Sequence, residues 1–314
     1  MLYLCATPIG NLGDISERVL EALRSVDVIA AEDTRQTIKL LNHFDIKKQM
    51  VAYHEHNRYE MTPILVGRLV AGEDIAVVTD AGTPAISDPG EDLVRACHEA
   101  GVKVTSLPGA TAFTTALTLS GMDARRFTFE GFLPQDKKDQ RTVLDRLKDA
   151  TVTTIFYEAP HRLVKTLKLI SGEIEGITCD RPADTVAQDA GMKTDKVEND
   201  VDESTTGSGM CRRIFVCKEL TKKHEWYMMF DSVSAAAEYF SENEEPRGEF
   251  VFVVEGLDPE TLAEQERIRW EEMDIQEHMQ IYLTQGMDRK EAMKQVAKDR
   301  GVSKRDIYRE VISG

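Results

Sequence analysis

The sequence lacks the features that mark membrane and secreted proteins. None of its apolar runs approaches the roughly 18 residues of a membrane-spanning helix. The first apolar segment, Leu2–Ala6, is too short for a signal peptide and has no basic residues before it. The five cysteines include no closely spaced pair, which argues against a zinc knuckle or a disulfide framework and indicates free thiols. We therefore expect a cytoplasmic protein that does not associate with a membrane.

Positive charge is also scarce. The 39 Lys and Arg residues are outnumbered by 55 Asp and Glu residues, and the net charge of −16 argues against indiscriminate binding to nucleic acids. The charge is unevenly distributed, because residues 171–210 are strongly acidic whereas residues 286–314 contain more bases than acids. A local basic site is therefore still compatible with the composition.

Both standard phosphate-binding motifs are missing. The segment Thr7–Asp14 follows the first predicted strand, where a phosphate loop would lie. It has neither the GxGxxG pattern of dinucleotide-binding folds nor the lysine of a P-loop. Nucleotide binding by either route is therefore disfavoured.

Short apolar strands alternate with helices along most of the chain. In the first third this pattern predicts a mainly parallel sheet with helices on both faces, and in the middle third a second α/β domain with a mixed sheet. The expected strands are 2–6, 26–31, 50–52, 75–78, 102–106, 126–130, 153–157, 213–218, 226–230 and 250–255. The expected helices are 16–24 (capped near Asp14), 34–44, 59–71, 91–100, one that opens at 108–111, 137–148 and 160–170.

The pattern becomes wholly helical after Leu257. Helices are expected over 259–270, 275–285, 288–300 and 304–312, with Ser303 as the cap of the last one. The last two helices meet at Gly301 and Val302, which is typical of a helix-turn-helix, although a plain helical cap is the alternative. We predict α/β domains at residues 1–121 and 122–257, with a flexible acidic insertion at about 171–212, and a helical tail at 258–314.

The segment Asp80–Gly90 is the most informative part of the chain. It is rich in glycine and proline and directly follows the strand at 75–78, and ligands of open α/β sheets bind at such carboxyl ends. Asp88 and Glu91 are spaced for a capping box, with Pro89 at the first position of the next helix. We interpret the segment as a loop that presents backbone groups to a small molecule. An ordinary tight connection is the alternative.

Two other segments lie in equivalent positions. Thr7–Asp14 and Pro108–Ala112 each join a predicted strand to a predicted helix. Because the carboxyl ends of parallel strands meet at one edge of a sheet, the three loops are expected to surround one pocket. Without a phosphate motif, this pocket is expected to bind an uncharged or zwitterionic ligand.

Polar clusters follow several strands as well. They are Glu32–Arg35, His54–Asn57, Glu158–Arg162 and Glu219–Glu225. Glu32 and Asp33 are candidates for general bases, and Arg35 and Arg162 for phosphate contacts. His54 and His56 would share one strand face, but no third ligand follows at a characteristic spacing, so no metal is expected. A helix cap or a surface ion pair is the alternative for any single residue.

Taken together, these motifs resemble a known family. They are Thr7–Asp14, Glu32–Arg35, Asp80–Gly90, Leu107–Ala110, Glu158–Arg162, Glu219–Glu225 and Pro246–Phe250. The chain resembles the bacterial 16S rRNA cytidine 2'-O-ribose methyltransferases of the tetrapyrrole (class III) methylase superfamily over residues 2–170 and 213–256, and in its helical tail. Residues 171–212 depart from this pattern, because the connection in the family is shorter.

The resemblance implies a fold, a cofactor and partners. It implies that S-adenosylmethionine, the methyl donor, lies in a cleft between two α/β domains of a homodimer. It also implies that 16S rRNA, free or in the small ribosomal subunit, is the substrate. By motif, the donor contacts would be Pro8, Asp80, Ala81, Gly82, Thr83, Ser87, Thr111, Ala112, Tyr157 and Leu220.

The implied reaction also needs a proton acceptor and phosphate contacts. The candidates for the acceptor of the 2'-hydroxyl proton are Glu32, Asp33, His54, His161 and Lys222, and we favour an acidic residue near Arg35. The candidates for contacts with RNA phosphates are Arg35, Arg162, Lys222, Lys223 and Arg247.

Two other functions are compatible with the sequence. One is methylation of a tetrapyrrole carbon, which would use the same donor pocket without a basic RNA surface. The other is a DNA-binding regulator that senses S-adenosylmethionine and reads DNA with residues 288–312. In that segment basic residues alternate with acidic ones, so a solvated helical face is as compatible as a groove-reading face.

Overall fold

The computed structural model describes residues 1–175, 186–188, 211–242 and 246–313. They form two compact units, one made of residues 1–144 and 153–255 and the other of residues 145–152 and 256–314, which are described separately. Most of the predicted acidic insertion lies outside the described residues. Among the helices of the described part, none has the length and apolar character that a membrane crossing requires.

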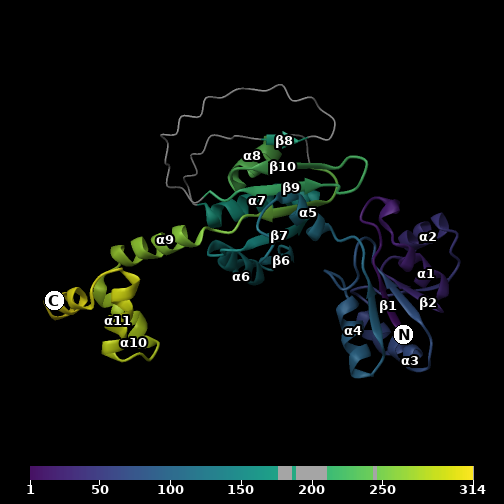
Figure 1. Cartoon of the computed structure of the whole chain (residues 1–314), viewed down its shortest axis with the longest axis horizontal. Helices are drawn as coiled ribbons and strands as arrows, with labels where there is room; N and C mark the ends of the chain where they lie inside the picture. The colour runs from purple at the N-terminus through teal and green to yellow at the C-terminus, as the bar shows by residue number, and fades with distance from the viewer. Residues whose placement is uncertain (176–185, 189–210, 243–245, 314) are drawn as a thin grey trace. The chain divides into compact units, whose positions relative to one another are not determined.

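The first part of the larger unit is a doubly wound parallel sheet (Figure 1). Its strands are β1 (Leu2–Cys5), β2 (Val28–Ala31), β3 (Gln49–Ala52), β4 (Ile75–Val78) and β5 (Val104–Leu107), in the order β3-β2-β4-β1-β5. Its helices are α1 (Glu17–Ser25), α2 (Thr34–His43), α3 (Arg58–Val70) and α4 (Gly90–Glu99). All strand pairs are parallel, as the βα alternation predicts.

Alternating side chains give this sheet two separate cores. On β4, Ala76 and Val78 pack with α1 and α2, whereas Ile75 and Val77 face the other way and pack with α3 and α4. Strands that are buried on both faces read as continuous apolar runs, which is why β4 could be predicted with correct ends. Helices therefore cover both faces, and the loops after the strands are left at the carboxyl edge of the sheet.

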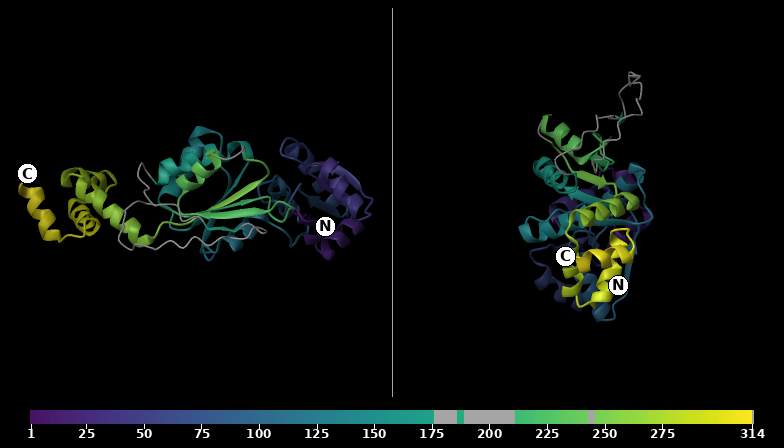
Figure 2. Two further views of the ribbon diagram at one scale, coloured as in Figure 1. Left: turned by 90° about the horizontal axis from the view of Figure 1, so that it is seen from above. Right: turned by 90° about the vertical axis from the view of Figure 1, so that its left-hand side faces the viewer.

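The second part of the larger unit is a mixed six-stranded sheet. Its strands are β6 (Phe127–Phe132), β7 (Thr153–Glu158), β8 (Val186–Gln188), β9 (Ile214–Lys218), β10 (Trp226–Phe230) and β11 (Phe250–Val254), in the order β6-β7-β11-β9-β10-β8. Only the β6–β7 pair is parallel among these described strands. The accompanying helices are α5 (Ala112–Ser120), α6 (Lys137–Lys148), α7 (Pro160–Ile174) and α8 (Val233–Glu242). The left view of Figure 2 shows this sheet nearly edge-on, with helices above and below it.

The predicted fold class is confirmed, but several local predictions need correction. Helix α1 is capped by Ser16, whose hydroxyl accepts from Val19 N–H, and not by Asp14. Helix α4 begins at Gly90 without a side-chain cap, so the predicted capping box is wrong. Helix α8 and the short strand β8 were not expected from the sequence. The interpretation of all cysteines as free thiols is wrong for Cys211, which is disulfide-bonded.

The smaller unit carries the C-terminal helices, drawn in yellow-green to yellow in Figures 1 and 2. They are α9 (Pro259–Glu272), α10 (Ile275–Thr284), α11 (Arg289–Asp299) and α12 (Lys304–Ser313), each within a few residues of the prediction. Their core contains Met279, Ala292, Val296, Ala297 and Ile307.

Candidate active site

Three loops at the carboxyl edge of the first sheet are joined to each other. Thr7 N–H donates to Gly82 O over 2.9 Å, and Gly82 N–H donates to Thr7 O over 3.1 Å. The Thr83 hydroxyl donates to Ala110 O and lies 3.0 Å from the hydroxyl of Thr111. The loops 7–14, 80–90 and 108–112 therefore form one connected wall, as the sequence predicts.

The glycine-rich loop is shaped by its own Asp88. The Asp88 carboxylate accepts from the backbone N–H groups of Ala85, Ile86 and Gly90 at 2.8–3.2 Å. Ala85 and Ser87 both have a left-handed backbone, with φ of 68° and 63°. Non-glycine residues rarely adopt this conformation and do so mostly where the surroundings impose it, often at ligand-binding sites. Asp88 thus fixes the loop and also binds the first backbone N–H of α4.

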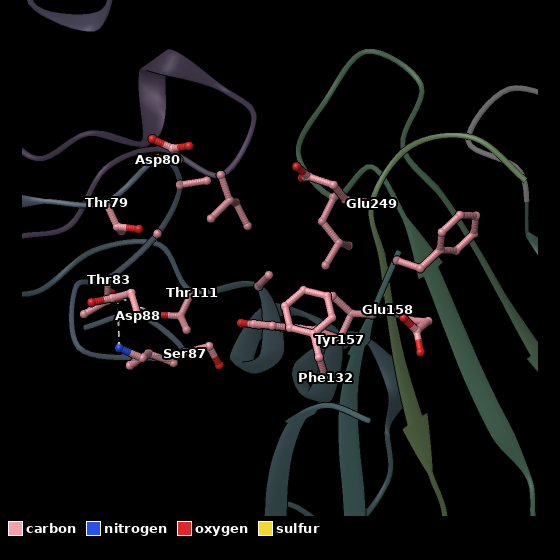
Figure 3. A pocket seen from close by; sticks show the side chains of 18 of the residues that line it. Thr79, Asp80, Thr83, Ser87, Asp88, Thr111, Phe132, Tyr157, Glu158 and Glu249 are labelled. Atoms are coloured by element: carbon pink, nitrogen blue, oxygen red, sulfur yellow. Dashed lines mark hydrogen bonds between the residues drawn. The ribbon is translucent and has the colours of Figure 1, made fainter. Parts of the chain in front are cut away.

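A cavity of about 370 Å³ lies between this wall and the second sheet (Figure 3). Figure 3 shows Thr79, Asp80 and Thr83 on one side and Phe132, Tyr157 and Glu249 on the other. The lining residues are Ile9, Glu32, Thr79–Thr83, Ile86–Asp88, Thr111, Ala112, Phe132, Tyr157–Pro160, Leu220 and Glu249–Val251. Its volume lies within the range of about 300–1,000 Å³ that is usual for small-ligand pockets.

All the charged residues that line the cavity are acidic. Glu32, Asp80, Asp88 and Glu249 contribute carboxylates, and no Lys, Arg or His is among the described residues that line the cavity. Burial, and then the charges of Glu32 and Asp33, raise the pKa of Asp80. Such an environment favours a ligand with positive charge and disfavours a polyphosphate.

The chain's similarity to known proteins identifies the class of ligand. Residues 1–204 match the family described as tetrapyrrole (corrin/porphyrin) methylases. The chain belongs to the tetrapyrrole methylase family. Enzymes of this family take the methyl group from S-adenosylmethionine, which is therefore the expected methyl donor of this chain.

Relatives within the tetrapyrrole methylase family match nearly the whole chain. A Halalkalibacterium halodurans protein named ribosomal RNA small subunit methyltransferase I is 42% identical, with 98% of this chain and 93% of that protein covered. A Synechocystis protein of the same name is 40% identical, with 98% and 96% covered. Two solved structures share the fold. The methyltransferase CobJ has a TM-score of 0.53 and 16% identity, with 81% of this chain and 93% of that chain covered. Diphthine synthase has a TM-score of 0.53 and 16% identity, with 84% of this chain and 93% of that chain covered.

The cavity fits the donor of a tetrapyrrole methylase. S-adenosylmethionine carries a sulfonium, and the described residues that line the cavity offer carboxylates and no cationic side chain. The close approach of the wall loops also leaves no room for side chains at one position: a Cβ at Gly109 would lie 2.6 Å from the Cβ of Ala6. Tyr157 closes the wall, since its hydroxyl accepts from Phe113 N–H at the start of α5 and its ring packs against Phe129 and Phe132.

The structure brings most of the predicted donor contacts together. Asp80, Ala81, Gly82, Thr83, Ser87, Thr111, Ala112, Tyr157 and Leu220 all line the cavity. Pro8 does not line it, whereas its neighbour Ile9 does. The roles of these residues as donor contacts stay a prediction.

Of the predicted catalytic residues in the methylase site, Glu32 alone lines the cavity. Its Oε2 accepts from the Thr79 hydroxyl at 2.5 Å and from Asp80 N–H at 3.3 Å. Asp33 caps α2 and accepts from the Arg35 guanidinium through both carboxylate oxygens, at 3.0 and 2.8 Å. These bonds lower the pKa of Asp33 to about 2, which makes it a weak base.

Lys222 is held at the edge of the cavity by two carboxylates. Its ammonium donates to Glu219 and to the cavity residue Glu249, both at 2.9 Å. Burial lowers the pKa of Lys222, but the bonds to Glu249 and Glu219 outweigh it and the pKa is raised. Lys222 therefore stays protonated near neutral pH, which suits a cationic contact and not a general base.

The other predicted polar residues have different surroundings. Arg162 donates to Leu133 O at 2.6 Å and pairs with the buried Glu158, so its guanidinium is used inside the domain. His161, Lys223 and Arg247 are exposed and do not line the cavity. Within the described residues, no group of three or more His, Cys, Asp or Glu is arranged to hold a metal ion.

Sequence reasoning missed part of the wall that the second sheet supplies, since it predicted Tyr157 and Leu220 but not the other residues. Phe132 and Glu249 line the cavity from the ends of two distant segments, and Val251 lies on β11. No local motif marks Phe132 or Val251, because their position at the cavity depends on how the two sheets face each other. The motif Pro246–Phe250 was the only available signal for Glu249.

Proposed function

We propose that this chain transfers a methyl group from S-adenosylmethionine to the ribose 2'-hydroxyl of a cytidine in 16S rRNA, in the decoding centre of the small subunit. The proposal is supported by identities of 40–42% over 98% of the chain with proteins named ribosomal RNA small subunit methyltransferase I. With rRNA as its substrate, the enzyme would act in the cytoplasm, and we propose a homodimer as its assembly.

The observation that carries the proposal is the separation of charges at the site. Carboxylates line the cavity, whereas the cation of Lys222 is tethered to the cavity residue Glu249. An acidic interior suits a sulfonium donor, and a cation at its edge suits the phosphate of an incoming nucleotide. Arg35, whose side chain is 87% exposed while paired with Asp33, would provide a second such contact.

The donor supplies a methyl group that its sulfonium has already activated for transfer. The protein has to align the acceptor oxygen with that group, and such positioning is worth roughly 7–11 kcal/mol. The three connected loops would hold the donor, and Phe132 and Tyr157 would limit the space available to it on the opposite side of the cavity. Lys222 and Arg35, with Lys223 and Arg247 as exposed cations, would position the RNA backbone.

The ribose hydroxyl must also lose its proton when its oxygen forms the new bond to carbon. Among the predicted acceptors, Glu32 lines the cavity, while Asp33 is paired with Arg35 and Lys222 is protonated. We therefore assign Glu32 as the acceptor of this proton. His161, exposed in the first turn of α7, does not line the cavity and is not retained.

A transfer assay with competing acceptors tests the proposal. The full-length protein is incubated with methyl-labelled S-adenosylmethionine and, in parallel, with small ribosomal subunits from a strain that lacks the enzyme, naked 16S rRNA and a porphyrin precursor. Mass spectrometry then maps ribose methylation, and excess S-adenosylhomocysteine serves as the control. Label on one cytidine ribose is expected. Label on the tetrapyrrole alone, or on a base, would overturn the proposal.

A further inference from the structure

The C-terminal unit contains a hydrogen-bonded turn between two helices. Helix α11 ends at Asp299 and α12 begins at Lys304, and Gly301 between them has a φ of +63°. Val302 N–H donates to Ala297 O at 3.0 Å, and the Ser303 hydroxyl caps α12 by accepting from Asp306 N–H. Ile307 is 1% exposed and anchors α12 in the core of the unit. A connection of four residues that contains a glycine matches the turn of a helix-turn-helix in length and composition.

A buried polar network holds the helices that support this turn. His278 is fully buried and stacks on Trp270, with ring centroids 4.0 Å apart and planes 8° apart. The Arg300 side chain donates to His278 Nδ1 at 3.2 Å and to Met273 O. Arg300 is the residue directly before Gly301, so the network fixes the end of α11 and the start of the turn. The exposed face of α12 is thus presented from a defined scaffold.

That exposed face is basic and carries an aromatic ring. Lys304 and Tyr308 are four residues apart, as are Arg305 and Arg309, and residues at this spacing share a helix face. All four are exposed, and Tyr308 keeps 54% of its surface accessible. An isolated exposed tyrosine among cations is the arrangement with which proteins stack on nucleic-acid bases and neutralise phosphates.

The acids of this region do not cancel its charge at the surface. Residues 286–314 contain eight Lys and Arg against five Asp and Glu, within a chain whose net charge is −16. Asp288 accepts from two backbone N–H groups at the start of α11, Asp299 accepts from Tyr282 and Gln295, and Asp306 accepts from Ser303. These three carboxylates are hydrogen-bonded within the unit but keep their negative charge, so the positive character of the segment comes from its excess of three basic over acidic residues.

We propose that the face of α12 formed by Lys304, Arg305, Tyr308 and Arg309 is an RNA-docking surface that binds a segment of small-subunit rRNA apart from the methylated nucleotide. The proposal rests on the proposed function for the choice of rRNA as partner. The cations contact backbone phosphates, and Tyr308 stacks on an unpaired base. Such contacts add affinity for the substrate without taking part in the transfer step.

Equilibrium binding of the full-length protein to 16S rRNA, measured by filter binding over a series of salt concentrations, tests this surface. In the variant Lys304→Gln/Arg305→Gln, the negative slope of log affinity against log salt is expected to become shallower by about 1.4–1.8. Tyr308→Ala is expected to weaken binding about 5-fold or more, and Tyr308→Phe to restore it. The matched control is Lys137→Gln/Lys138→Gln, which removes two exposed lysines at the start of α6.

Each result has a defined meaning. An unchanged slope and affinity in the α12 variants, or an equal loss in the control, would overturn the docking surface, as would tighter binding to duplex DNA than to rRNA. Calorimetry with S-adenosylhomocysteine is expected to give wild-type donor affinity for all variants, and a loss there would show misfolding and count against an exposed docking role. If rRNA is bound through α12 but never methylated, the proposed function fails while the docking surface stands.

Discussion

Thr7 and Gly82 exchange two backbone hydrogen bonds, although they belong to loops that follow different strands. The Thr7 hydroxyl adds bonds to Thr79 O and Gly82 O, at 3.2 and 3.4 Å. The first loop and the glycine-rich loop therefore behave as one piece of backbone. A change in either loop is expected to alter the shape of the donor cavity.

The first prediction concerns the backbone of Gly82. Its φ of +93° is unfavourable for any other residue, so Gly82→Ala is expected to shift the loop, cost about 1–2 kcal/mol of stability and sharply weaken donor binding. Gly72→Ala is the matched control, because Gly72 has a φ of +102°, does not line the cavity and has free space around it. Thermal unfolding should show similar losses in both variants, and calorimetry should show weakened donor binding in Gly82→Ala only. Equal donor affinity in the two variants would contradict the site.

The second prediction separates charge from shape in the cavity. Asp80→Asn keeps the size of the side chain and removes a carboxylate from the lining. If the cavity recognises a sulfonium, the affinity for S-adenosylmethionine should fall more than the affinity for S-adenosylhomocysteine, which lacks that charge. Because the pKa of Asp80 is raised, wild-type donor binding should also weaken on acidification at a higher pH than for an ordinary Asp. Calorimetry with both ligands measures the ratio, and an equal loss for the two would argue against charge recognition.

The sequence predicts the fold well where local and long-range signals agree. Strand β4 and helix α6 have the predicted ends, because an apolar run and a strong amphipathic pattern leave no alternative. The loops after β1, β4 and β5 could be assigned to one pocket, because parallel strands place their carboxyl ends at the same edge.

The rest of the site depends on burial and on contacts that the sequence pattern does not reveal. Arg162 looks like a free cation in the sequence, but Glu158, four residues before it, is buried beside it and pairs with it. Phe132 and Glu249 reach the cavity only because the second sheet faces the glycine-rich loop. The sequence also does not show that Asp33 pairs with Arg35. This pairing makes Asp33 a weaker base and so favours Glu32 as the proton acceptor.

The third prediction concerns pH and the C-terminal unit. Burial, and then the nearby Arg300, lower the pKa of His278, against the opposing effect of Asp299. The unfolded chain therefore binds a proton at His278 more readily than the folded unit does, and this contribution to stability, present above about pH 6.5, is lost as the pH falls. In a Trp226→Phe background, the fluorescence of Trp270, which stacks on His278, should report unfolding at a lower temperature at pH 5.5 than at pH 7.5. His278→Gln should reduce this difference, and an unchanged difference would contradict the assignment.

The fourth prediction distinguishes the two neighbouring acids as proton acceptors. Glu32→Gln retains an oxygen that can accept from the Thr79 hydroxyl, so the donor site should keep its shape while the base is lost. We expect kcat for methyl transfer to fall about 10²- to 10⁴-fold, with the affinity for S-adenosylhomocysteine, which lacks the sulfonium charge, near that of the wild type. Asp33→Asn should instead loosen Arg35 and raise KM for RNA, with little change in kcat, because Asp33 with a pKa of about 2 contributes little as a base. Methyl-transfer rates measured over a series of RNA concentrations, up to saturation, separate kcat from KM in both variants. A large loss of rate in Asp33→Asn with full activity in Glu32→Gln would reverse the assignment, since the proton would then leave through the carboxylate that Arg35 holds.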